Sequence, residues 1–253
     1  MKKKGYTIVI NNMKGGVGKT TIAFNTAYQL SQKNYRVLCL DLDPQKNLTS
    51  FFAMNGNEKG LSIDDVLGRS FDYESACNSL IKSITQSRYK NLDFVYGTSG
   101  NIPAAREGDL DCVLSEIRWM YDSIIIDTHP DFGSFSKSAL LASDLIIAPV
   151  LLDGFSRDNM NLMVENLNQF ETEYDRSFNY MMLANKVRNT RSQKDIYTDL
   201  ISKHDFPIFE TCITDSACVG SALVMRKPVA LHRSKSQVAL DYSDLSDEIA
   251  ALF

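Results

Sequence analysis

Eight residues near the N-terminus, Lys14-Gly15-Gly16-Val17-Gly18-Lys19-Thr20-Thr21, decide the fold of this chain of 253 residues. They follow a short apolar run at Thr7–Ile10 and open a helix-like segment, which is the context that a phosphate-binding loop requires. Glycines let backbone N–H groups approach phosphate oxygens, and a helix N-terminus adds positive potential. In such a loop Lys19 would contact the β and γ phosphates and Thr20 would bind Mg²⁺.

The loop departs from the strict pattern G-x-x-x-x-G-K-[ST] at one position. Met13 stands where the pattern requires its first glycine, and the loop gains an additional lysine, Lys14, near its start. The eight residues therefore predict a nucleotide-binding loop of a variant kind.

Short aliphatic runs recur along the chain with helical patterns between them. Nearly all-apolar runs are typical of a parallel sheet that is covered on both faces, and the alternation predicts a doubly wound α/β fold. No repeat, linker or boundary divides the chain, so we expect one domain over residues 1–253, with a helical excursion at about 55–90. The expected strands are Thr7–Ile10, Val37–Leu40, Phe94–Tyr96, Ile124–Ile126, Leu145–Val150 and Met181–Leu183. One expected helix has a core-facing stripe formed by Met160, Met163, Val164, Leu167 and Phe170.

Composition limits the classes of function. Hydrophobic residues make up 44% of the chain, which is enough for a sizeable core, and the net charge of -4 means that any nucleic-acid surface must be local. The five cysteines form no CxxC pair and are expected to be reduced. We find no signal peptide or bilayer-spanning run, so a soluble, cytoplasmic protein is expected.

Beyond the loop, further segments carry a family resemblance. The phosphate loop is similar to the deviant Walker A motif of the ParA/MinD ATPases, and the likeness covers nearly the whole chain, more loosely after residue 150. His129 departs from it, because the family usually has proline or cysteine there. The other matching segments are Asp41-Leu42-Asp43-Pro44-Gln45, Ile124–Thr128 (Walker B), Ile146–Val150, Ala184-Asn185-Lys186 and Lys227-Pro228-Val229.

The resemblance implies a P-loop NTPase that uses ATP and Mg²⁺ and closes as a nucleotide-sandwich homodimer. Lys14 would reach the partner's phosphates, as an arginine finger does. Asp43 would position or polarise the attacking water, Asp41 would support Asp43 or the switch loop, and Asp127 would hold Mg²⁺ through water. The implied nucleotide contacts are Lys14, Gly15, Gly16, Val17, Gly18, Lys19, Thr20, Thr21 and, for adenine, Asn185.

Each of these assignments has a simpler alternative. Asp41 and Asp43 could be ordinary turn carboxylates, and Asn185 could be a turn residue at a strand end. A carboxylate that ends a buried strand, such as Asp127, needs a partner, and Mg²⁺ is one candidate. We interpret His129 as a switch-loop residue with a structural role, since the three histidines show no metal-ligand spacing.

Two basic clusters stand out on an otherwise acidic chain. Both suit contacts with phosphates without base reading, although a solvated charged face is the alternative. The resemblance implies non-specific DNA binding by the dimer. The acidic C-terminal tail, in which Leu245, Ile249 and Leu252 are expected to face the core, argues against a membrane surface. The DNA-binding candidates are Lys186, Arg188, Arg191 and Lys194 in one cluster, and Arg226, Lys227, Arg233 and Lys235 in the other.

The leading hypothesis is a nucleoid-associated partition ATPase with weak activity of its own that a ParB-like partner and DNA stimulate. A second hypothesis keeps the ATPase and exchanges DNA for a protein, conjugation or envelope cargo. A third is a metabolic enzyme on the same fold. An iron-sulfur reductase would need cysteines near the dimer axis, and the stretch after Asp127 has none.

Overall fold

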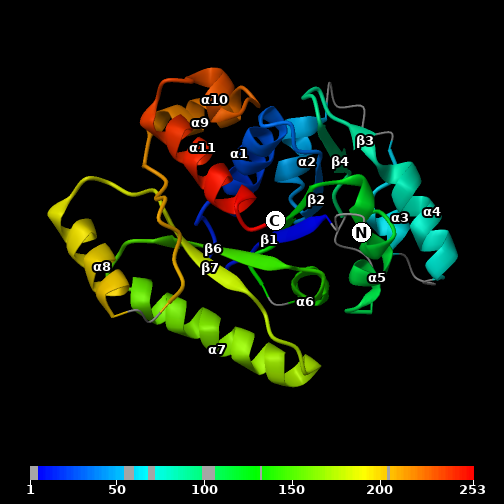
Figure 1. The fold of residues 1–253 in the computed structure, drawn as a ribbon, viewed down its shortest axis with the longest axis horizontal. Coiled ribbons are helices and arrows are strands. Elements are labelled where there is room, and N and C mark those ends of the chain that lie inside the picture. The colour runs from blue at the N-terminus through cyan, green and yellow to red at the C-terminus, as the bar shows by residue number, and fades with distance from the viewer. Residues whose placement is uncertain (1–4, 54–59, 68–71, 99–105, 132, 204–205) are drawn as a thin grey trace.

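A central sheet of seven strands organises the chain (Figure 1). The computed structural model describes residues 5–53, 60–67, 72–98, 106–131, 133–203 and 206–253. Neighbouring strands lie in the order β3-β4-β2-β5-β1-β6-β7, and every pair is parallel except β3–β4. The strands are β1 (Tyr6–Ile10), β2 (Val37–Leu42), β3 (Thr85–Gln86), β4 (Leu92–Val95), β5 (Ser123–Thr128), β6 (Leu145–Leu151) and β7 (Tyr180–Asn185).

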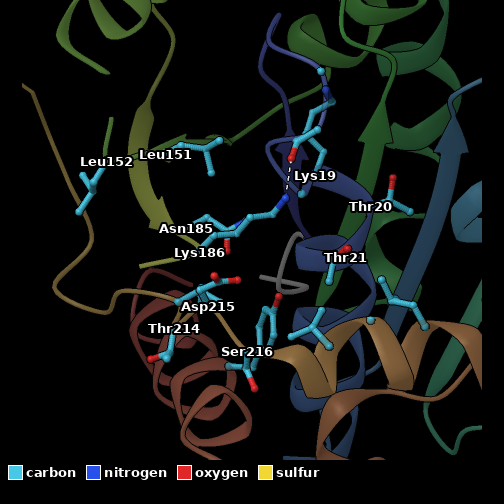
Figure 2. A pocket seen from close by; sticks show the side chains of 18 of the residues that line it. Lys19, Thr20, Thr21, Leu151, Leu152, Asn185, Lys186, Thr214, Asp215 and Ser216 are labelled. Carbon is cyan, nitrogen blue, oxygen red and sulfur yellow. Dashed lines mark hydrogen bonds between the residues drawn. The ribbon is translucent and has the colours of Figure 1, made fainter. Parts of the chain in front are cut away.

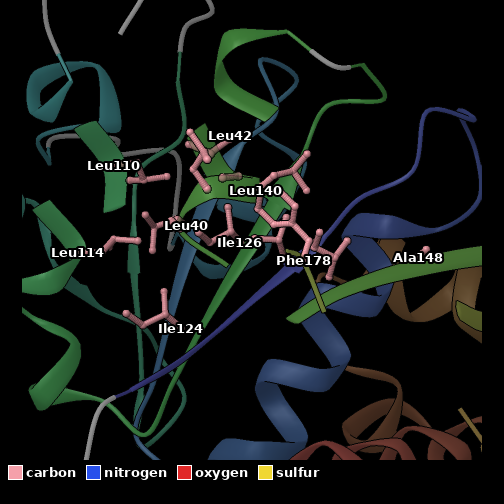
Figure 3. Packing of buried hydrophobic residues seen from close by; sticks show 14 of the residues in the cluster. Leu40, Leu42, Leu110, Leu114, Ile124, Ile126, Leu140, Ala148 and Phe178 are labelled. Atoms are coloured by element: carbon pink, nitrogen blue, oxygen red, sulfur yellow. The ribbon is translucent and has the colours of Figure 1, made fainter. Parts of the chain in front are cut away.

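The expected doubly wound fold is confirmed, because the side chains of a single strand are divided between two hydrophobic cores, one on each face of the sheet. In β2, Leu38 and Leu40 belong to one core cluster, whereas Val37 and Cys39 belong to the other. Because successive side chains in a strand point to opposite faces, the sheet carries a hydrophobic core on each side. Figure 3 shows the first of these cores, in which strand residues such as Ile126 meet helix residues such as Leu110.

Helices cover both cores (Figure 1). One face is packed by α3 (Ile63–Val66), α4 (Tyr73–Ser83), α5 (Asp109–Ser115), α6 (Ser134–Leu141), α7 (Ser156–Tyr174) and α8 (Arg191–Ser202). The other face is packed by α1 (Lys19–Gln32), α2 (Asn47–Phe52), α9 (Ala217–Val224), α10 (Val229–His232) and α11 (Gln237–Ala250). A 3₁₀ turn, η1 (Arg118–Met120), precedes β5. None of the helices in the described ranges is long and apolar enough to cross a membrane.

Most expected elements are found, with shifted ends. The strand expected at Phe94–Tyr96 lies at Leu92–Val95, because Tyr96 leaves β4 and instead pairs with Ser62. The two-residue strand β3 was not expected, since so short a segment has no periodicity to read. The expected excursion at 55–90 contains α3 and α4, while 54–59 and 68–71 lie outside the described residues.

The two apolar helix faces differ in how well they were predicted. In α7 the expected stripe is buried, with Val164 partly so. In the C-terminal helix Leu245 and Ile249 are fully buried, but the expectation for Leu252 was wrong, because α11 ends at Ala250 and Leu252 remains 44% exposed. Phe253 packs instead, with its ring stacked on Tyr6 at 5.4 Å between centroids.

Candidate functional site

A pocket of about 890 Å³ opens at the carboxyl ends of the parallel strands, where open α/β sheets place their ligands. The phosphate loop forms one wall of it, and the ends of β6 and β7 form another (Figure 2). A third wall comes from residues 213–223, which lie between β7 and α11. The sequence predicted the first wall, and it gave no sign of the third.

The backbone of the phosphate loop requires glycine at two positions. Gly16 and Gly18 have φ of 75° and 95°, values that side chains with a Cβ rarely adopt. Gly18 is also the N-cap of α1, and a Cβ there would lie 2.5 Å from Nδ2 of Asn185. The loop therefore turns into the helix N-terminus with its N–H groups available for an anion.

The last residue of β7, Asn185, and the residue that follows it, Lys186, hold this loop in place. Nδ2 of Asn185 donates to the carbonyl of Val17 at 2.6 Å, and Nζ of Lys186 donates to the carbonyl of Gly16 at 2.8 Å. Asn185 is buried and lines the pocket, so its predicted place in the site fits, although its amide is used to brace the loop. Its contact with adenine stays a prediction.

Lys19 lies buried at the start of α1, and its ammonium forms no ion pair with a carboxylate among the described residues. Its Nζ donates to the carbonyl of Asn12 at 2.9 Å, and Asn12 is fixed in turn by its bond to the carbonyl of Pro149. Burial lowers the pKa of Lys19, and the carboxylates of Asp127 and Asp43 oppose this shift. Phosphate oxygens would compensate the buried charge better than one carbonyl does.

Asp127 is the buried acid that best fits a magnesium site. It is fully buried at the end of β5, and neither carboxylate oxygen has a hydrogen-bond partner among the residues that the structure describes. Burial raises its pKa well above the usual range, Asp41 adds to this, and the nearby Thr20 hydroxyl lowers it without forming a bond of ordinary geometry. Unpartnered buried oxygens beside a hydroxyl are the hard ligands that Mg²⁺ prefers. A bound Mg²⁺ would offset phosphate charge, with Thr20 and Asp127 holding it.

Asp41 and Asp43 have different environments. In Asp41, Oδ2 accepts from both N–H and Oγ1 of Thr49, and Oδ1 accepts from the N–H of Asp43. Burial raises the pKa of Asp41 to about 6, although the Thr49 and Asp43 bonds lower it. Asp41 is thus occupied in holding α2 and the turn after β2, while Asp43 lines the pocket. This geometry suits Asp41 as a positioning residue and Asp43 as the acid near the ligand.

Lys14 lies beside the pocket and does not line it. Its Nζ forms an ion pair of 2.9 Å with Oδ2 of Asp153, and both side chains are more than one third exposed. Asp153 does line the pocket, and it caps the turn into α7 by accepting from the N–H of Phe155. The extra lysine of the loop is therefore partly exposed at the rim of its own site, where it is paired with a carboxylate that lines the pocket.

The contacts of His129 are with its own turn, between β5 and α6. Its Nδ1 lies 3.1 Å from Oδ2 of Asp131, and the histidine side chain is 41% exposed. Asp131 also accepts from Gly133 N–H and the Ser136 hydroxyl, so the group organises the turn between β5 and α6. This is compatible with the structural role expected of His129, which stays a prediction.

The first basic cluster is divided by the fold. Lys186 holds the phosphate loop, and Arg188 lines the pocket with its Nε 2.6 Å from Oδ2 of Asp215. Arg191 and Lys194 lie on the exposed surface of α8. All four side chains remain exposed, but Lys186 and Arg188 are engaged by the phosphate loop and by Asp215, whereas Arg191 and Lys194 lie on α8 away from the pocket lining.

The second basic cluster stays together. Arg226 and Lys227 form the turn between α9 and α10, and Arg233 and Lys235 lie between α10 and α11. All four are exposed, and this surface is well separated from α8 (Figure 1).

Several site residues were missed by sequence reasoning. Asn12 and Asp153 belong to no phosphate-loop pattern, although Asn12 lies two residues after the end of the first strand, which is a usable signal for a site residue in this fold. The wall at Thr214, Asp215 and Ser216 has no motif, and only the fold brings it to the loop.

Comparisons with known proteins identify the family of the chain. The family model described as an AAA domain matches residues 5–180, which is most of the chain. The sporulation initiation inhibitor protein Soj of Bacillus subtilis is 28% identical, over 98% of this chain and 99% of its own. The virulence plasmid ParA family protein pGP5-D of Chlamydia trachomatis is 30% identical, over 97% of this chain and 94% of its own.

A solved structure shows the same fold at lower identity. A putative plasmid partition protein of Borrelia burgdorferi, bound to AMPPNP, is similar with a TM-score of 0.77 and 22% identity over 99% of this chain and 100% of its own. Other similar structures contain ADP and magnesium. With the matched family model and the full-length relatives, these findings establish that the chain belongs to the ParA/MinD family of ATPases.

Proposed function

We propose that this chain, acting as one ATPase domain over residues 1–253, is a cytoplasmic, ATP-dependent partition protein that binds non-specific DNA as a dimer. A ParB-like partner would stimulate hydrolysis and thereby move a plasmid or chromosome. The observation that carries this proposal is the position of Lys14, which is partly exposed at the rim of a pocket that it does not itself line.

The surroundings of Lys14 support action on a second copy. Met13, Phe155 and Leu162 are apolar side chains that are 39%, 70% and 50% exposed on this side of the molecule. Nδ2 of Asn166 on α7 contacts Sδ of Met13, which joins the loop to that helix. A partner protomer would cover these side chains and present its phosphates to Lys14, whose charge would stabilise the leaving phosphate.

Within each site the remaining roles follow from position. Lys19 and the loop N–H groups would bind the β and γ phosphates, with Thr20 and Asp127 at Mg²⁺. Asp43 would orient the attacking water, and Asp41 would hold Asp43 through its bond to the Asp43 N–H. Hydrolysis would then require both protomers, so activity should be weak in the absence of dimerisation.

The DNA surface that we propose is formed by the second basic cluster. Residues 216–240 contain no acidic residue, so positive charge there is not compensated locally. Such a surface suits phosphate contacts without base reading. Arg191 and Lys194 would add to it only if the dimer brings α8 to the same side.

The test is fluorescence anisotropy of a random-sequence duplex with ATP-Mg²⁺, with ADP-Mg²⁺ and without nucleotide. Binding should appear only with ATP and should weaken steeply with salt. Replacing Lys227 and Arg233 by alanine should weaken binding at least tenfold, whereas the matched pair Arg191→Ala and Lys194→Ala should have less effect. Absence of binding in all three nucleotide states would refute the DNA proposal and leave the ATPase intact.

One observation favours the second candidate, a positioning ATPase for a protein cargo. Val224, Met225 and Leu231 are 86%, 51% and 53% exposed among the basic residues, and such apolar side chains are unusual on a phosphate-binding surface. The cell division protein PomZ of Myxococcus xanthus is also a relative, at 27% identity over 94% of this chain and 76% of its own. ATP-dependent dimerisation without DNA binding would support this candidate.

A further inference from the structure

The third wall of the pocket is held in place from outside. Its central residues, Thr214, Asp215 and Ser216, face the ends of β6 and β7 across the pocket from the phosphate loop (Figure 2). The phosphate loop binds the charged end of a nucleotide, so this opposite wall would meet the base. This step rests on the function proposed above.

Backbone pairing with Val187, two residues after the end of β7, fixes one side of the wall. The N–H of Val187 donates to the carbonyl of Ile213, and the N–H of Asp215 donates to the carbonyl of Val187, at 2.9 and 2.8 Å. In this parallel pairing the N–H and the carbonyl of the intervening residue, Thr214, both point away from β7. The N–H and the carbonyl of Thr214 are therefore available to groups on the side of the segment that faces away from β7.

On that other side lies α11, and Asp241 meets the wall there. Oδ2 of Asp241 accepts from the N–H of Thr214 at 2.8 Å, and its Oδ1 accepts from Nε2 of Gln237 at 2.8 Å. Asp241 is only 6% exposed and does not line the pocket, although its neighbour Tyr242 does. A buried carboxylate that accepts a backbone N–H fixes that peptide group strongly.

A second acid of the same helix holds the start of the segment. Glu248 accepts from the N–H groups of Glu210 and Thr211. Asp241 and Glu248 are seven residues apart, which is about two helical turns, so both lie on the face of α11 that meets this segment. The helix therefore clamps the segment from 210 to 214 at two points.

We propose that Asp241 is a positioning residue for base selectivity. By fixing the Thr214 peptide group, Asp241 holds the Thr214 carbonyl in the third wall as a hydrogen-bond acceptor that favours an adenine base. The Thr214 carbonyl accepts hydrogen bonds and donates none, so it suits the 6-amino group of adenine and disfavours the 6-oxo group of hypoxanthine or guanine. The phosphates are bound by the phosphate loop, so loss of Asp241 should change the affinity for one base relative to another.

The experiment compares the dissociation constants of ATP and inosine triphosphate by calorimetry in Mg²⁺. Their ratio cancels the phosphate contacts that the two ligands share, and it also cancels any loss of active protein. We expect wild-type protein to prefer ATP by more than tenfold, and Asp241→Ala to lower this ratio by about tenfold, which is the effect of one good hydrogen bond.

Two matched variants separate the hydrogen bond from charge and from helix damage. In Asp241→Asn the amide oxygen of the new asparagine can still accept from the Thr214 N–H. Its amide nitrogen can donate to Gln237, because the exposed Gln237 amide can turn to present its oxygen, so the ratio should be retained. Asp244→Ala removes a carboxylate from an exposed position of the same helix and should change nothing. An asparagine variant as unselective as the alanine variant would overturn the proposal, and so would an unchanged ratio in Asp241→Ala.

Hydrogen exchange on the wild-type protein tests the same idea without a substitution. The Thr214 amide should be protected before nucleotide is added, and rapid exchange there would overturn the proposal even if Asp241→Ala failed to fold. A wild-type protein that binds neither nucleotide would instead refute the function proposed above. Binding of both nucleotides with equal affinity would refute only the role of the wall.

Discussion

The contact between Gly18 and Asn185 allows a quantitative test of how the site is built. In Gly18→Ala the new Cβ would lie 2.5 Å from Nδ2 of Asn185, at a backbone φ of 95°. The left-handed conformation costs a residue with a Cβ about 1–2 kcal/mol. Nδ2 is the end of a flexible side chain, so Asn185 can move away, but its bond to Val17 is then lost.

That lost bond, 2.6 Å long and buried, contributes about 1 kcal/mol. The sum predicts that Gly18→Ala lowers the free energy of unfolding by about 2–3 kcal/mol. For a chain of this length the melting temperature should fall by roughly 4–12 °C. Urea unfolding and calorimetry on nucleotide-free protein measure both quantities.

Two further variants make the reasoning refutable. Gly15→Ala is the matched control in the same loop, since among the described residues, its two chain neighbours aside, no heavy atom lies within 4 Å of the new Cβ, and it should cost less than about 0.5 kcal/mol. In an Asn185→Ala background, Gly18→Ala should cost only the backbone part, which gives a coupling of about 1 kcal/mol. Equal destabilisation by Gly15→Ala and Gly18→Ala, or an absent coupling, would show that the close contact does not limit position 18.

Three more substitutions test the chemistry of the pocket. Lys19→Ala should reduce ATP affinity at least a hundredfold in calorimetry, because the buried ammonium is lost, and normal affinity would contradict the phosphate-loop assignment. Asp43→Ala should keep ATP binding and trap the dimer, seen by light scattering, with turnover at least a hundredfold lower; unchanged turnover would remove Asp43 from water positioning. Burial raises the pKa of Asp127, so the metal-free protein should lose stability as pH rises from about 4 through the raised value. Asp127→Asn should therefore raise the urea midpoint of the metal-free protein at neutral pH, and it should abolish the stabilisation by Mg²⁺-ATP. A lowered midpoint would show that Asp127 has a structural partner.

The sequence allowed the fold and the phosphate side of the pocket to be predicted because both depend on local patterns. Apolar runs such as Ile124–Ile126 identify buried strands, and the spacing of Gly16, Gly18 and Lys19 is a backbone requirement that can be read from one segment. The roles of Asp41 and Asp43 could not be separated in this way, because they depend on Thr49, eight residues further along, reaching back to Asp41.

The opposite side of the pocket was not predictable because its parts come from distant segments. Lys186 and Arg188 appear in the sequence as half of a basic cluster, yet one braces Gly16 and the other pairs with Asp215. Asp215 compensates the charge of Arg188, and Lys186 is occupied by a neutral carbonyl of the loop, so a count of local charge overestimates the surface that α8 offers to DNA. The family model ends at residue 180, before every one of these residues except the loop itself. Differences among such ATPases in base preference and in the surface offered to a partner are therefore expected to lie after β6, where the sequence resemblance is weakest and the tertiary contacts decide.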